Sequence, residues 1–134
     1  MAGFIKVRVL NIISGSKVGG AEKFFERFCI ALNNEKNVEQ FVIIKKNNMR
    51  FELLNQHGLR TVELGFRSNF DFITQNKIKE VIDIFKPDVT LCWMNRASRM
   101  LPNSLNSKKF VGRLGGYYKL KNYAKCDYLI ANTY

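Results

Sequence analysis

Three stretches of this sequence carry glycines, basic side chains or aromatic hydroxyls in a pattern that suits the binding of a phosphate or a sugar. They are residues 15–20, 94–99 and 113–119, and each follows or ends a short apolar run. Glycine lets another group approach the backbone closely. The free N–H groups at the start of a helix favour an anionic or hydroxyl-rich ligand. These stretches therefore predict a ligand-binding edge.

The candidate binding residues all belong to these three stretches. Gly19 and Gly20 leave room before a helix, and Arg113 lies near the end of an apolar strand. Tyr117 offers a flat ring for stacking on a sugar and a hydroxyl for hydrogen bonding. The complete set is Gly19, Gly20, Asn95, Arg96, Arg113, Gly115, Gly116 and Tyr117.

Each of these features also has an explanation that needs no ligand. The glycine turn could join two elements and do nothing else. Arg96 could project into solvent, and Arg113 could pair with a nearby carboxylate. The turn is not a P-loop, because no Gly-Lys-Ser/Thr follows it, and the G-x-G-x-x-G dinucleotide pattern is absent.

No catalytic or metal-binding set emerges from the sequence. His57 is the only histidine and falls at the end of a predicted helix, where a solvated side chain is expected. Cys29, Cys92 and Cys126 are far apart and form no C-x-x-C pair, so we expect reduced, mostly buried thiols and no zinc site. The catalytic residues stay unassigned, and we expect neither a metal nor a cofactor.

Apolar runs and amphipathic segments alternate along the chain. The predicted strands are 7–13, 38–45, 59–64, 88–93, 109–114 and 127–131, and the predicted helices are 20–33, 49–56, 69–85 and a short one within 94–100. Alternation of this kind predicts a parallel sheet with helices on both faces. We expect a Rossmann-like three-layer α/β/α domain with a mainly parallel sheet in the order 3-2-1-4-5-6.

This topology determines where the three stretches lie. Ligands of open parallel sheets bind outside the carboxyl ends of the strands, near the switch in strand order. All three stretches come at such ends, and strands one and four are neighbours across the proposed switch. We therefore expect the turns that hold Gly20, Asn95 and Arg113 to open onto one shared edge.

The charge of the chain points to an anionic partner. Its 134 residues include 22 basic and 11 acidic side chains, a formal net charge of +11. Nucleic acid, a phosphorylated substrate or an acidic membrane surface would each fit, and a merely basic surface is the alternative. The densest basic region is 108–125, which has no acidic residue.

The length predicts one domain, and the lack of a spanning segment or signal peptide predicts a cytoplasmic protein.

The sequence resembles the N-terminal domain of GT-B retaining glycosyltransferases of the group 1/family 4 type. The resemblance rests on VLNIISGSKVGGAEKFFERFCIAL at 9–32, KPDVTLCWMNRASRMLP at 86–102 and FVGRLGGYYKLKNYAKCDYLIANT at 110–133. It covers nearly the whole chain in the right order. The WMNRAS and RLGGYYKLKNY segments are more specific than GGAE and look like one bacterial subgroup.

The resemblance implies one half of a GT-B fold, in which the N-terminal domain binds the acceptor and a C-terminal domain holds the nucleotide-sugar. Gly19 and Gly20 would line the cleft, and Asn95, Arg96, Arg113 and Tyr117 would form the acceptor side. Many relatives have a histidine after the fifth strand, where this chain has Arg-Leu-Gly-Gly-Tyr-Tyr. The resemblance therefore assigns no catalytic residue here.

On this resemblance, residues 1–134 form a single acceptor-binding domain without the donor-binding half. The expected activity is sugar transfer from a nucleotide-sugar to a lipid-linked or envelope glycan, with the domain inactive alone. Further expectations are peripheral contact with an anionic membrane at its inner face and self-association through an unfinished interdomain surface. The alternative is a stand-alone basic α/β module that binds nucleic acid or a protein, favoured by the aromatic and basic residues within 117–128.

Overall fold

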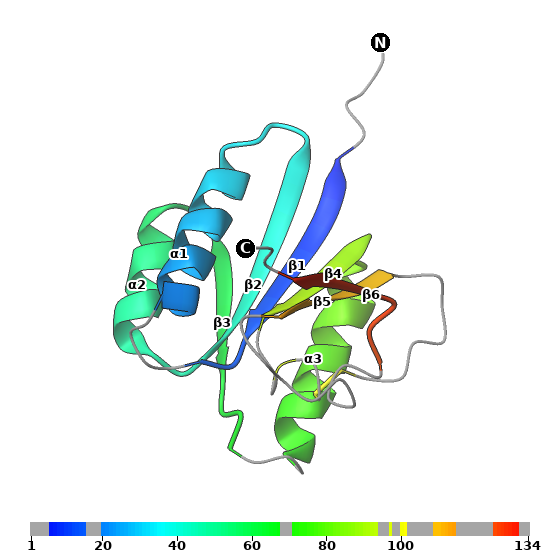
Figure 1. The fold of residues 1–134 in the computed structure, drawn as a ribbon. Helices are drawn as coiled ribbons and strands as arrows, with labels where there is room; N and C mark the ends of the chain where they lie inside the picture. Colours follow the sequence, from blue (N-terminus) through cyan, green and yellow to red (C-terminus); the bar gives the residue numbers. More distant parts are fainter. Residues whose placement is uncertain are drawn as a thin grey trace.

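The protein folds around one six-stranded sheet. A computed structural model describes residues 6–15, 20–67, 71–93, 97, 100–101, 109–114 and 125–131. The strands are β1 (Val7–Ile13), β2 (Val38–Lys45), β3 (Arg60–Leu64), β4 (Val89–Trp93), β5 (Lys109–Leu114) and β6 (Tyr128–Ala131). Every pair is parallel and the order is β3-β2-β1-β4-β5-β6, which confirms the predicted Rossmann-like topology (Figure 1).

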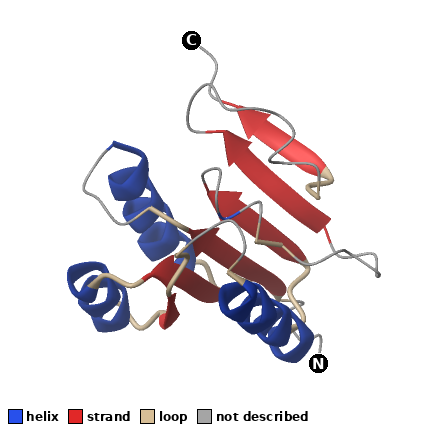
Figure 2. Ribbon diagram, turned by 90° about the horizontal axis from the view of Figure 1, so that it is seen from below, coloured by secondary structure: helices blue, strands red, loops and turns tan. Residues whose placement is uncertain are grey.

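Three helices cover the two faces of this sheet. They are α1 (Gly20–Asn33), α2 (Asn48–Gln56) and α3 (Phe72–Phe85). Figure 2 shows α1 and α2 on one side of the sheet and α3 on the other, as the alternating pattern predicts. None of the helices within the described ranges has the length and apolar character needed to cross a bilayer.

Successive side chains of each strand enter different cores, because strand residues point alternately to opposite faces. Leu10 and Ile12 of β1 lie in the core beneath α3, whereas Ile13 lies in the core beneath α1 and α2. The first, which we call the α3-side core, also contains Ile78 and Phe85 of α3. The second, the α1/α2-side core, contains residues of both of its helices and Trp93 of β4.

Several elements begin one residue away from the predicted position, for local reasons. Strands β4 and β6 begin after Asp88 and Asp127, whose carboxylates accept hydrogen bonds from the backbone N–H groups of Arg8 and Phe110, at 2.8 and 2.9 Å. Helix α2 begins at Asn48 because the side chain of Asn47 caps it. Such caps satisfy N–H groups that the first turn leaves unpaired.

The start of α3 differs more from the prediction. The predicted helix begins at residue 69, whereas α3 begins at Phe72 with Asp71 as its N-cap. The Asp71 carboxylate accepts hydrogen bonds from the backbone N–H groups of Arg67 and Thr74 and from the Thr74 hydroxyl, at 2.7 to 3.0 Å. These bonds hold the pKa of Asp71 below its ordinary value.

Candidate functional site

The carboxyl ends of the central strands bring together residues that are distant in sequence. The strand register places Ile13 of β1 beside Trp93 of β4, and Trp93 beside Arg113 of β5. Helix α1, the next element after β1, begins at this same edge with Gly20. Two of the predicted binding residues, Gly20 and Arg113, therefore lie at one edge of the sheet. The other six, Gly19, Asn95, Arg96, Gly115, Gly116 and Tyr117, lie outside the described residues.

Gly20 is exposed, and a side chain there would meet little of the protein. A Cβ atom built at this position has no heavy atom within 4 Å. Packing among the described residues therefore does not require glycine at residue 20. The open space is compatible with a ligand close to the start of α1, where backbone N–H groups lack helical partners.

Arg113 contacts two aromatic rings from different elements. Its guanidinium carbon lies 4.7 Å from the ring centroid of Phe24 in α1 and 4.7 Å from that of Trp93 in β4. The two rings themselves are 5.8 Å apart. A guanidinium over an aromatic face is held by cation–π attraction while its N–H donors point outward in its own plane. The rings thus fix the position of the cation beside the first turns of α1.

Phe24 is an exposed aromatic residue on α1. It is 48% exposed, whereas Phe25 and Cys29 of the same helix are fully buried. Its ring stacks on that of Phe28 and lies at a tilted angle to that of Trp93. An exposed aromatic ring that contacts an arginine at the ligand edge is available to a ligand as well.

A chain of buried hydrogen bonds lies beneath this group. The Trp93 indole N–H donates to the Asn11 side-chain oxygen at 3.0 Å, and the Asn11 amide donates to Gln40 at 2.6 Å. The Gln40 amide donates in turn to the backbone oxygen of Cys29 in α1 at 2.9 Å. Asn11 and Gln40 are almost completely buried, and buried polar groups are tolerated when they are paired in this way. The network fixes the orientation of Trp93 and hence the platform for Arg113.

Arg50 is a further charged residue at this edge, and the sequence analysis does not single it out. Its side chain is 3% exposed, and its Nε donates to the Glu26 carboxylate of α1 at 3.2 Å. One of its terminal nitrogens donates to the backbone oxygen of Gly15 at 2.6 Å. Arg50 of α2 therefore ties α1 to the turn that follows β1. No sequence signal marked it, because arginine at a helix start ordinarily faces solvent.

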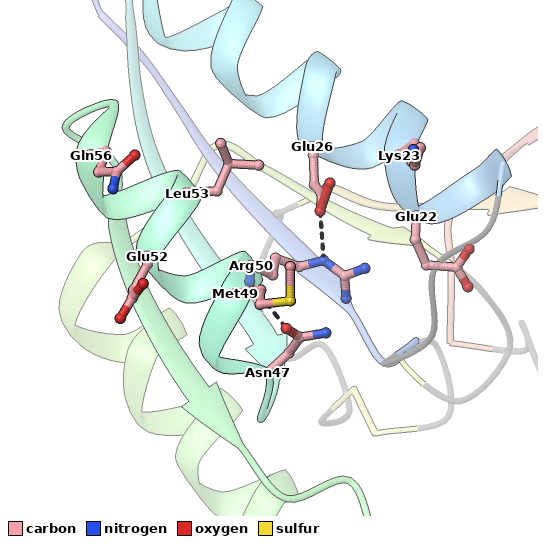
Figure 3. A pocket seen from close by; sticks show the side chains of 9 residues that line it. All are labelled: Glu22, Lys23, Glu26, Asn47, Met49, Arg50, Glu52, Leu53 and Gln56. Carbon is pink, nitrogen blue, oxygen red and sulfur yellow. Dashed lines mark hydrogen bonds and ion pairs between the residues drawn. The ribbon is translucent and has the colours of Figure 1, made fainter.

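A pocket of about 480 Å³ lies between α1 and α2 (Figure 3). Glu22, Lys23 and Glu26 line it from α1, and Arg50 and Leu53 line it from α2. Figure 3 shows Arg50 reaching across from α2 to Glu26 of α1. The pocket begins two residues after Gly20, so it adjoins the edge that carries the predicted binding residues.

The three cysteines are free and at least partly buried, as the sequence predicts. Cys29 and Cys92 are buried, Cys126 is partly buried, and all three are free. Burial raises the pKa of Cys29 and that of Cys92, so both remain thiols at neutral pH. Within the described ranges, no group of three or more histidine, cysteine, aspartate or glutamate side chains is arranged to hold a metal ion.

Comparison with known proteins points to bacterial sugar enzymes. No family model matches the chain. It is 33% identical over 119 residues to the lipopolysaccharide core biosynthesis glycosyltransferase LpsE and 36% identical over 115 residues to LpsD, both from Rhizobium meliloti. The matches cover 87% and 83% of this chain but only 34% and 32% of those proteins. The chain therefore spans about one third of the length of these relatives.

Solved structures with a similar fold are sugar-nucleotide enzymes. A UDP-GlcNAc 2-epimerase from Neisseria meningitidis, bound to UDP-GlcNAc, aligns with a TM-score of 0.59 at 14% identity and covers 89% of this chain and 35% of that one. Another UDP-N-acetylglucosamine 2-epimerase aligns with a TM-score of 0.58 at 15% identity, covering 94% and 42%. At these low sequence identities, the similarity to the epimerases establishes a shared fold only.

The fold and the sequence relatives agree on a class. The parallel sheet in the order β3-β2-β1-β4-β5-β6 is that of a Rossmann-like half of a GT-B protein. The homologues are lipopolysaccharide core glycosyltransferases, of which the chain matches one third. The chain therefore fits the N-terminal domain of a GT-B glycosyltransferase.

Proposed function

We propose that residues 1–134 form the single, acceptor-binding N-terminal domain of a retaining glycosyltransferase. The enzyme would move a sugar from a nucleotide-sugar to a lipid-linked or envelope glycan. The observation that carries this proposal is the match to two lipopolysaccharide core glycosyltransferases over more than four fifths of the chain. The basic, aromatic edge around Arg113 supports it, because stacked rings and in-plane guanidinium donors suit a sugar that bears an anionic group.

The acceptor side of this proposed enzyme is the edge where β1, β4 and β5 end. Arg113 would bind an anionic or hydroxyl group of the acceptor, with Gly19, Gly20, Asn95, Arg96, Gly115, Gly116 and Tyr117 around it. A second domain, corresponding to part of the relatives' remaining length, would hold the nucleotide-sugar. Alone, the acceptor domain would be inactive, because the donor diphosphate would lack its preorganised electrostatic partners.

Two surface properties support further contacts of the proposed enzyme. Its net charge of +11 suits peripheral attachment to the anionic inner face of a membrane, where a lipid-linked acceptor would lie. Strand β6 at the edge of the described sheet exposes about half of Tyr128, Leu129 and Ile130. Exposed apolar side chains on an edge strand favour association, either with another domain or with a second copy.

The test is a calorimetric titration that measures the affinity of the chain for a lipopolysaccharide core oligosaccharide. We expect Arg113→Ala to weaken binding roughly tenfold, the effect of losing one charge-assisted contact of about 1.4 kcal/mol. Arg60→Ala is the matched control, because Arg60 also lies over two rings, Phe41 and Phe85, but at the amino end of β3. Equal effects of the two substitutions would contradict the proposal.

The basic charge also favours a second candidate, a module that binds single-stranded nucleic acid. The same two variants separate it from the first. Tight, salt-sensitive binding of a single-stranded RNA that is unchanged by Arg113→Ala, with no binding of the oligosaccharide, would support the nucleic-acid module.

A further inference from the structure

The pocket between α1 and α2 differs in charge from the rest of the protein. Its lining includes three carboxylates, those of Glu22, Glu26 and Glu52, and two cations, Lys23 and Arg50. The chain as a whole carries twice as many basic as acidic residues. Arg50 is already engaged by Glu26 and by the backbone oxygen of Gly15. With Glu26 paired to Arg50, the lining keeps two further carboxylates, those of Glu22 and Glu52, against the single cation Lys23. This negative balance disfavours a phosphate or a carboxylate in the pocket.

The same lining suits a hydroxyl-rich ring. Carboxylates accept hydrogen bonds from hydroxyl groups, and the side-chain amide of Gln56 can both donate and accept. Met49 and Leu53 supply apolar surface for the C–H face of a sugar, and Met49 is 82% exposed. The volume of about 480 Å³ is within the range of roughly 300–1,000 Å³ that small-molecule sites occupy.

The position of the pocket connects it with the edge around Arg113. Glu22 lies in the first turn of α1, two residues after Gly20. Arg50, in the lining of the pocket, donates a hydrogen bond to the backbone oxygen of Gly15, two residues after β1 ends at Ile13. A glycan seated between α1 and α2 would therefore lie next to the chain segment that leaves the carboxyl end of β1.

We propose that the α1–α2 pocket binds a sugar ring of the acceptor glycan that carries no phosphate or carboxylate group. This inference rests on the proposed function and divides the acceptor between two places. An uncharged or amino-bearing ring occupies the pocket, and the anionic or reacting portion lies towards Arg113. Substrate choice at the pocket then follows from the excess of carboxylates in its lining, which discriminates against phosphorylated sugars.

Amide chemical shifts of the isotopically labelled chain test the proposal. Titration with glucose or N-acetylglucosamine should shift the amides of residues 22–26 and 47–53. Titration with glucose 6-phosphate should shift the same amides with a dissociation constant roughly tenfold higher. Leu53→Phe, which fills the pocket from a half-buried position, should reduce sugar binding by roughly tenfold. Ile84→Phe is its control, because Ile84 is 74% exposed on α3, on the other face of the sheet.

A second substitution keeps the test valid if Leu53→Phe perturbs α2. Glu52 is exposed, so Glu52→Gln leaves packing unchanged while removing one carboxylate. It should narrow the difference in affinity between glucose and glucose 6-phosphate, whereas Glu80→Gln on α3 should leave that difference unchanged.

Failure of the pocket proposal can be distinguished from failure of the proposed function. If the core oligosaccharide binds and Arg113→Ala weakens it, but the pocket amides do not shift and Leu53→Phe has no effect, the pocket proposal is overturned and the proposed function stands. If neither the oligosaccharide nor any of the monosaccharides binds, both are overturned. Stronger binding of glucose 6-phosphate than of glucose at the pocket amides would overturn the pocket proposal alone.

Discussion

The two faces of the sheet are packed by different means. The α3-side core is formed mainly by apolar side chains such as Leu10, Ile78 and Phe85, with the small buried hydroxyls of Thr74 and Thr90 on the same side. The α1/α2 side contains the buried polar residues Asn11, Gln40 and Arg50, and the edge of this side carries Arg113. Apolar packing alone can stabilise a face, but buried polar groups cost free energy unless every one is paired. A face that keeps such groups at its ligand edge is organised for more than stability.

The difference shows what the polar groups do. On the α1/α2 side, each hydrogen bond joins two elements: Asn11 joins β1 to β4, Gln40 joins β2 to α1, and Arg50 joins α2 to the turn after β1. These bonds fix the relative positions of the elements that surround the candidate site. The three predictions below, together with the binding experiments above, test that difference, beginning with the largest expected effect.

Asn11→Ala should lower the free energy of unfolding by about 3 kcal/mol. The substitution leaves the Trp93 indole N–H and the Gln40 side-chain oxygen buried without their partner, at a cost of about 1–3 kcal/mol each. Urea denaturation followed by far-ultraviolet circular dichroism measures the change. Asn34→Ala, at an exposed position after α1, should stay within about 0.5 kcal/mol. A loss below 1 kcal/mol at Asn11 would show that the network does not stabilise this face.

Arg50→Met should lower the free energy of unfolding by about 2 kcal/mol, because the Gly15 backbone oxygen and the Glu26 carboxylate both lose a donor. A double-mutant cycle with Glu26→Gln should give a coupling energy of at least about 1 kcal/mol. The exposed pair of Lys77 and Glu80 on α3 is the matched control, with an expected coupling below about 0.5 kcal/mol. Equal coupling energies for the two pairs would show that the ion pair on the α1/α2 side stabilises the fold no more than the exposed pair on α3.

Thr90→Val should have the smallest effect and the opposite sign. The Thr90 hydroxyl is buried, and it makes no hydrogen bond within the part of the chain that the structure describes. By strand alternation it faces the α3-side core, since Cys92 two residues later lies there. Replacing an unpaired hydroxyl by a methyl group should raise the free energy of unfolding by up to about 1 kcal/mol. Destabilisation by more than 1 kcal/mol in the same urea experiment would mean that the hydroxyl has a partner.

The central strands could be predicted from sequence because burial on both faces gives them continuous or nearly continuous apolar runs. FVII in β2 and DVTLCW around β4 are examples. The alternation of strands and helices then restricts the topology to a few arrangements. The first residues of β4 and β6 could not be predicted, because Asp88 and Asp127 cap neighbouring strands through side-chain bonds that depend on the register.

The position of Arg113 at the edge of the sheet was predictable, but its contacts were not. Arg113 follows an apolar run, so its place at the carboxyl edge follows from topology. That it stacks on Phe24 depends on how α1 crosses the sheet, which a helical pattern does not specify. Asn11 carried a usable signal, since a polar residue within a buried strand requires a partner. Arg50 carried none, because its burial arises only when α1 and α2 pack together.

The strand order has a consequence for the way the polypeptide acquires its structure during synthesis. Strand β1 pairs on one side with β2 and on the other with β4, whose residues lie about 80 positions further along the chain. The β1–β2–β3 half can assemble as soon as β3 has emerged from the ribosome, whereas the second half must wait for a contact of long sequence separation. Such separations slow folding, so the nascent chain passes through a stage in which one side of β1 has no neighbour.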